Sequence, residues 1–116
     1  MLTLEELKEK PEILNHIDWQ LDPQEAFEAY QVKSVGSWKH RHLPEVFHFY
    51  LDIWKGEAKV LLMRRSLKSA EDVAEISVPP EMVASCLEKH VGGRAVSGQY
   101  PIDDSIRDWI RTQLGQ

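Results

Sequence analysis

Three of the five histidines fall within nine positions of the 116-residue chain, at His40, His42 and His48. Imidazole nitrogens bind zinc and other divalent ions, and His40 and His42 face the same way in an extended segment. Asp52 adds a carboxylate on the same strand face as His48. Against this interpretation, the cation Arg41 lies between the first two histidines. The sequence therefore leaves two alternatives: a divalent-metal site, or a basic loop followed by a partly buried strand histidine.

Positive charge concentrates in the middle of the chain. Residues 1–30 carry eight acids and two bases, residues 31–68 eight bases and three acids, and residues 69–116 eight acids and four bases. The basic segment either complements the acidic helices of its own chain or binds an anionic ligand or an acidic partner protein. Nucleic acid is an unfavoured partner, because the whole chain has a net charge of −5 and lacks a ribonucleoprotein motif.

Tryptophan and arginine are the side chains that most often dominate protein interfaces. We therefore take Trp38, Arg41, Trp54 and Arg64 as the candidate binding residues of the basic segment. Trp54 precedes the turn residues Lys55-Gly56 and is the anchor that we most expect to be exposed. The expected partner is another protein or a second copy of the chain.

Catalysis is the third chemistry that the residue types suggest. His48 with Asp52 has the composition of an oriented base, and the single thiol, Cys86, occupies an apolar helical position typical of a buried side chain. The chain has no nucleophile elbow, phosphate loop, dinucleotide fingerprint or zinc-protease motif. The pair Gly92-Gly93 follows a helix and indicates a helix stop. The sequence therefore favours a non-enzymatic domain without a cofactor.

Helical spacing at both ends and strict alternation in the centre predict the elements. Capping residues and apolar spacing predict helices after Thr3, after Pro11, over 23–32, after Pro80 and after Asp103. Alternation predicts strands over 45–54, 58–65 and 73–78, with residues 93–99 as a loop. The first strand is expected to place one set of apolar side chains on a single face: Phe47, Phe49, Leu51 and Ile53.

Because the strands are grouped between runs of helices, the predicted fold class is α+β. We expect a single domain over 1–116, in which N-terminal and C-terminal helices cover a three-stranded antiparallel meander. A sheet of this size leaves edges, and one edge is a candidate for pairing with a second copy to form a homodimer.

Composition places the chain among globular proteins. Hydrophobic residues make up 42% of it, which is enough for a core, and a single cysteine excludes an intrachain disulfide. The first residues have no signal-peptide pattern, and no apolar run is long enough to cross a membrane. We therefore expect a cytoplasmic location.

Two segments resemble a small uncharacterised family of anaerobic sulfate- and metal-reducing bacteria. The residues that carry the resemblance are Leu4, Leu7, Pro11-Glu12, Asn15, Ile17-Asp18-Trp19, Pro23, Ala26, Tyr30, Tyr100-Pro101-Ile102-Asp103-Asp104 and Trp109. The resemblance implies a prokaryotic cytoplasmic protein and brings neither an activity nor site residues. The expected function is an accessory or interaction domain; the alternative is a divalent-metal or anion-binding domain at His40, His42 and His48.

Overall fold

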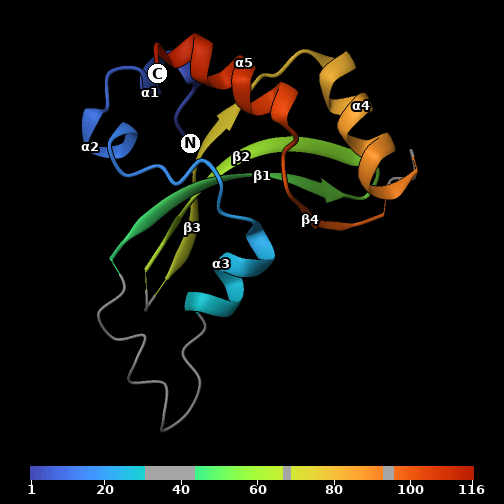
Figure 1. The fold of residues 1–116 in the computed structure, drawn as a ribbon, viewed down its shortest axis with the longest axis horizontal. Helices are drawn as coiled ribbons and strands as arrows, with labels where there is room; N and C mark the ends of the chain where they lie inside the picture. Colours follow the sequence, from blue (N-terminus) through green and yellow to red (C-terminus); the bar gives the residue numbers. More distant parts are fainter. Residues whose placement is uncertain (31–43, 67–68, 93–95) are drawn as a thin grey trace, which may run out of the picture.

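The computed structural model describes residues 1–30, 44–66, 69–92 and 96–116 and has the predicted α+β fold (Figure 1). Three helices precede three strands, and a helix, a short strand and a last helix follow. In chain order the elements are α1 (Leu4–Leu7), α2 (Pro11–Leu14), α3 (Pro23–Tyr30), β1 (Val46–Trp54), β2 (Glu57–Arg65), β3 (Ala70–Ile76), α4 (Pro80–Val91), β4 (Gly98–Tyr100) and α5 (Asp104–Leu114).

The sheet is antiparallel and has the strand order β3-β2-β1-β4. The predicted β1-β2-β3 meander is confirmed. The prediction of a loop over 93–99 was wrong at its end, because Gly98–Tyr100 pair with Leu51–Ile53 of β1. A three-residue strand is too short for alternation to reveal, and only its pairing with β1 defines it.

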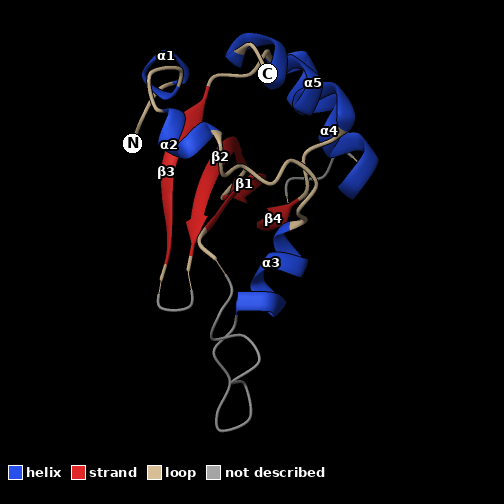
Figure 2. Ribbon diagram, turned by 60° about the vertical axis from the view of Figure 1, so that its left-hand side comes forward, coloured by secondary structure: helices blue, strands red, loops and turns tan. Residues whose placement is uncertain are grey.

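The inner face of the sheet holds the main core. As predicted, Phe47, Phe49, Leu51 and Ile53 lie together there, and each is at most 4% exposed. Side chains from α1, α4 and α5, among them Leu7, Cys86, Ile106 and Ile110, complete the cluster. Figures 1 and 2 show α1, α4 and α5 along this side of the sheet.

The outer face carries the other set of β1 side chains. Tyr50 packs with Leu61 and Met63 of β2 in a second, smaller apolar cluster. Helix α3 contacts β1 and β4 and lies apart from the other helices (Figures 1 and 2). The predicted helix over 23–32 is described as far as Tyr30.

At each edge of the β1-β2-β3 meander, one extended residue from the N-terminal part of the chain pairs with the outer strand. Leu2 forms a parallel bridge with Ala74 of β3, with backbone hydrogen bonds of 2.8 and 3.0 Å. Ile17 bridges Phe47 of β1 in the same way, and the flanking hydrogen bonds are 2.8 and 3.2 Å long. These backbone groups are already paired, so they cannot pair with a second copy.

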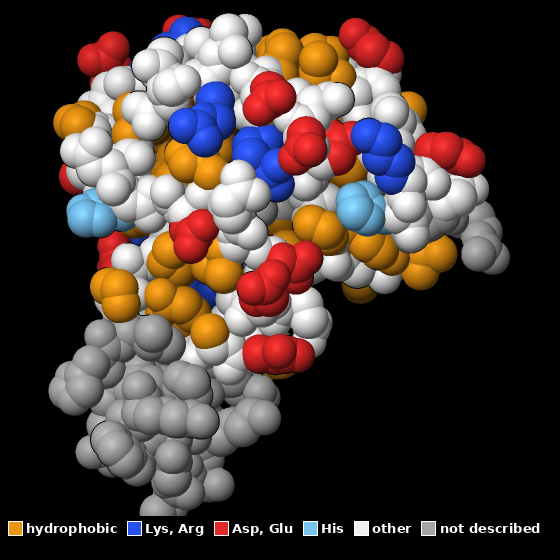
Figure 3. Space-filling model, in the orientation of Figure 1, with side chains coloured by type: hydrophobic (Ala, Val, Ile, Leu, Met, Phe, Trp, Pro, Cys, Tyr) orange, Lys and Arg blue, Asp and Glu red, His pale blue; other side chains and the backbone are white. Residues whose placement is uncertain are grey.

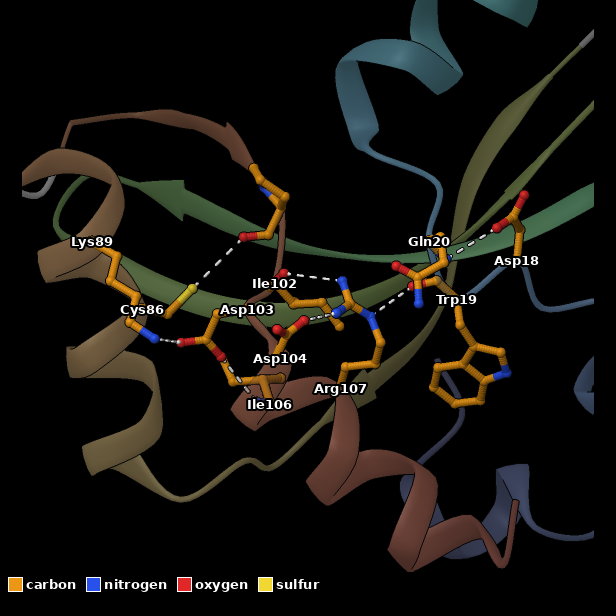
Figure 4. A network of polar contacts seen from close by, with 11 residues as sticks. Asp18, Trp19, Gln20, Cys86, Lys89, Ile102, Asp103, Asp104, Ile106 and Arg107 are labelled. Atoms are coloured by element: carbon orange, nitrogen blue, oxygen red, sulfur yellow. Dashed lines mark hydrogen bonds and ion pairs between the residues drawn. The ribbon is translucent and has the colours of Figure 1, made fainter.

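The connector between α2 and α3 is fixed to α5 by a network of polar contacts (Figure 4). The Arg107 side chain donates from Nε to the Trp19 carbonyl, at 2.8 Å, and forms an ion pair with Asp104. The Trp19 ring stacks on Phe49, with 5.3 Å between centroids, and the Arg111 guanidinium lies 5.1 Å from its centroid. These contacts connect the segment at Trp19, near the start of the chain, with the last helix, α5.

The predicted caps of α1 and α5 are confirmed. Thr3 and Glu6 form a reciprocal capping box at α1, and the Asp103 carboxylate accepts a 3.0 Å hydrogen bond from the Ile106 N–H at α5. Asp103 also accepts from Lys89 of α4, at 3.2 Å, which ties the two C-terminal helices together (Figure 4). Within the described ranges, no helix has the length and apolar character needed to cross a membrane.

Candidate functional site

The turn between β1 and β2 presents a tryptophan to solvent. Trp54 is the last residue of β1, and its side chain is 63% exposed. Lys55 and Gly56 follow with φ angles of 50° and 82°, the left-handed values that a two-residue hairpin turn requires. The Lys55 amine lies 5.6 Å from the centroid of the Trp54 ring. We call these three residues, together with Ser97, the hairpin tip.

The hairpin tip is braced by the segment that precedes β4. The Lys55 N–H donates to the Ser97 hydroxyl at 3.3 Å, and β4 pairs with the end of β1 directly below. Val96, next to Ser97, is half-exposed. The Trp54 side chain is therefore exposed on a backbone that is held from two sides.

The four candidate binding residues have different positions. Trp54 is exposed, as predicted, whereas Trp38 and Arg41 lie outside the described residues. Arg64 makes two ion pairs, at 2.6 Å each, with Glu45 and Glu71. The hydrogen bonds that Arg64 donates to both carboxylates raise its pKa and occupy its donors. A role for Arg64 as an anchor stays a prediction, but its charge is already neutralised.

The basic segment does not pair with the acidic helices in the described part of the chain. There, every ion pair of a hairpin base involves Arg64, and its partners come from the residue before β1 and from β3. The remaining ion pairs lie within or between helices and their caps. Among these residues, no ion pair therefore supports charge complementarity between the hairpin and the acidic helices.

Of the three predicted metal ligands, His40 and His42 lie outside the described residues, and His48 is buried with no exposed surface. The His48 Nε2 accepts a 3.0 Å hydrogen bond from the Arg65 Nε. Burial, followed by the charge of Arg65, lowers the pKa of His48 to about 4, so the ring is neutral and carries its proton on Nδ1.

Neither ring nitrogen of His48 then offers a lone pair to a metal, and the neighbouring cation Arg65 repels one. Among the described residues, no three or more His, Cys, Asp or Glu side chains form a group that could hold a metal. A metal site in this region would therefore have to be formed by His40 and His42, which lie outside the described residues.

The outer face holds a second, partly buried polar contact that the sequence did not indicate. The Tyr50 hydroxyl donates to the Asp72 carboxylate at 2.6 Å, and burial together with this acceptor raises the Tyr50 pKa. Burial also raises the pKa of Asp52, and the Asp72 charge adds to the effect. Asp72 was missed because the third strand was predicted to begin at residue 73, whereas β3 begins at Ala70.

A groove lies between α3 and β4, lined by Pro23, Gln24, Phe27 and Gln99. Phe27 is 48% exposed there, and none of the four lining side chains titrates. In the space-filling view, apolar side chains lie among acidic ones over this part of the molecule (Figure 3). The groove offers a contact surface but no acid, base or nucleophile for catalysis.

Comparison with protein-family models, with curated proteins and with solved structures found no match to the chain. The resemblance of its opening and closing segments to a bacterial family therefore stays a prediction. Any function has to be argued from the geometry described above.

Proposed function

We propose that the chain is a small protein-interaction domain that binds its partner through the hairpin tip. The single observation that carries this proposal is the position of Trp54, which is 63% exposed although the other tryptophans in the described part of the chain pack against the core. Trp19 and Trp109, for comparison, are both partly buried against the core. Tryptophan is the residue most enriched at interface hot spots, and its burial by a partner removes a large apolar area from water.

The bracing of the tip supports this role. A backbone that is already held in a paired strand and a fixed turn loses little conformational freedom on binding, which lowers the entropic cost of association. The Ser97 hydroxyl and the β4 pairing hold the Lys55 backbone and the end of β1 in this way.

The chemistry of the tip suggests the partner. The Trp54 ring and the Lys55 amine form one contact surface, and Lys55 makes no ion pair with any described residue. An apolar segment flanked by an acidic residue complements such a surface. The partner is another protein or a second copy of this chain.

Site-specific photocrosslinking tests the proposal. The chain is produced in cells with p-benzoylphenylalanine at position 54, and in parallel at position 113, where Gln113 is exposed on α5 far from the tip. We expect a discrete crosslinked species from position 54 and none from position 113. Its mass distinguishes a second copy of the chain from a different protein.

Competition makes the experiment specific. An excess of unmodified wild-type chain should suppress the crosslink, whereas a Trp54→Ala chain should not, and Lys55→Glu should compete weakly because it reverses the charge beside the ring. Equal crosslinking from both positions, or equal competition by Trp54→Ala and the wild type, would show that the hairpin tip is not the binding surface.

A further inference from the structure

Arg65 is a buried cation at the end of β2, on the outer face of the sheet. Its side chain is 6% exposed, and its cross-strand neighbours are Val46 on β1 and Ala70 on β3. The adjacent Arg64 points to the other face, where two carboxylates hold it. Two consecutive arginines thus have opposite surroundings.

Arg65 has no carboxylate partner in the chain. All 19 acidic residues belong to the described part, because segments 31–43, 67–68 and 93–95 contain neither Asp nor Glu. None of these described acids forms an ion pair with Arg65. Asp72 is close enough to raise the pKa of Arg65 through its charge, but its carboxylate accepts the Tyr50 hydroxyl instead.

The Arg65 guanidinium is oriented by one hydrogen bond. Its Nε donates to the neutral ring of His48 at 3.0 Å, and its terminal nitrogens have no partner among the described residues. The only described side-chain polar atom that is both sealed from solvent and unpartnered is the His48 Nδ1. The terminal nitrogens of Arg65, which are unpartnered but do not belong to this class, therefore keep some contact with solvent.

Burying a cation without an ion pair costs free energy of folding. Burial lowers the pKa of Arg65, yet a guanidinium does not give up its proton in a protein. Removing such a charge from water without a counter-ion is strongly unfavourable, so buried charges are normally paired. Asp72 acts on Arg65 only through its charge and without an ion pair, so a direct counter-ion is left to a ligand.

We propose that Arg65 is the anchor of a binding site for the carboxylate of a small organic acid. The planar fork of two free terminal nitrogens matches the two oxygens of a carboxylate. Tyr50 and Met63 lie on the same face of the sheet in the small apolar cluster, and these apolar surroundings favour a ligand with an apolar body over an inorganic anion. A phosphate dianion suits the site less well, because Arg64, the adjacent described cation, is turned away and neutralised.

Titration with sodium benzoate at constant ionic strength tests the proposal, with sodium chloride and inorganic phosphate as comparisons. We expect benzoate to bind the wild-type chain, as measured by calorimetry, and to raise its Tm. Arg65→Met removes the charge while keeping an unbranched apolar stem, and should weaken benzoate binding by at least about tenfold, the loss expected for a charge-assisted hydrogen bond. Arg64→Met, the matched control on the same strand, should bind benzoate like the wild type.

A second measurement uses the wild-type chain alone. Benzoate should shift the side-chain Nε–H resonance of Arg65 in a nitrogen–proton NMR spectrum and leave that of Arg64 in place. The proposal is overturned by an unshifted Arg65 resonance, by a benzoate response no larger than that to chloride, by stronger binding of phosphate than of benzoate, or by equal benzoate affinity in Arg65→Met. Trp54→Ala should keep benzoate binding, so this result is independent of the hairpin tip.

Discussion

The two faces of the sheet are built from the same strands and differ in what they bury. The inner face buries only apolar side chains of β1, and apolar side chains of β2, β3 and three helices complete the core. The outer face buries His48, Arg65 and the Tyr50 hydroxyl beside a three-residue apolar cluster, and it ends in an exposed tryptophan. Burying polar groups costs stability unless each is paired, so the inner face supports the fold and the outer face is the place to look for function.

Two neighbouring leucines of β2 give the most direct comparison of the faces. Leu62 faces the main core and Leu61 the small outer cluster. Leu62→Ala should lower the free energy of unfolding by about 4 kcal/mol and Leu61→Ala by about 2 kcal/mol, since the larger and more rigid core collapses less around a cavity. Urea denaturation monitored by circular dichroism measures both, and equal losses would mean that the outer cluster is packed as firmly as the core.

Acidic pH should weaken the outer face specifically. The folded chain holds the His48 pKa at about 4, below the value of about 6.5 for an unperturbed histidine, so the unfolded chain gains a proton first as the pH falls. The contribution of His48 to the free energy of unfolding is constant above pH ~6.5. It falls by about 3 kcal/mol between pH ~6.5 and ~4.

Two histidine-to-glutamine variants separate this effect from the titration of carboxylates. His48→Gln keeps an acceptor for Arg65 and removes the titration, so its stability should fall less than that of the wild type from pH ~6.5 to ~4. His16→Gln, at an exposed histidine, should follow the wild type. Parallel pH profiles for His48→Gln and the wild type would contradict the assignment of a buried neutral imidazole.

The contact between Tyr50 and Asp72 should have a smaller effect. Tyr50→Phe removes one hydrogen bond to a carboxylate that is itself exposed, and we expect a loss of about 1 kcal/mol in the free energy of unfolding. Chemical denaturation of Tyr50→Phe, Asp72→Asn and the double variant measures the coupling between them. Additive losses would mean that the hydroxyl and the carboxylate contribute independently.

The hairpin tip should matter least for stability. Trp54→Ala should change the free energy of unfolding by less than about 0.5 kcal/mol, because an exposed side chain contributes little to the core. Thermal denaturation measures this directly. A loss comparable to that of Leu61→Ala would mean that Trp54 has a structural role, and the tip would then be a weaker candidate for binding.

The inner face was the predictable part of the molecule. Alternation from Phe47 to Ile53 determines which side chains point to the core, and the capping residues Thr3 and Asp103 mark two helix starts. These signals are local, so neighbouring residues are enough to reveal them.

The outer face was predictable only in part. The exposure of Trp54 follows from its place before a turn, but the contact of His48 with Arg65 joins residues 17 positions apart across two strands. The pairing of Tyr50 with Asp72 depends in addition on the shift in register between Leu62 and Met63. Such contacts depend on register and depth, which a single sequence does not encode locally.

The bridges made by Leu2 and Ile17 bear on how the chain folds as it is synthesised. Leu2 pairs with β3, Ile17 with β1, and the connector at Trp19 with Arg107 of α5. A ribosome makes these N-terminal residues first, but the last of their partners emerges about ninety residues later. The opening segment therefore waits for partners that are made in stages, first β1, then β3 and finally α5, and its docking is completed late in folding.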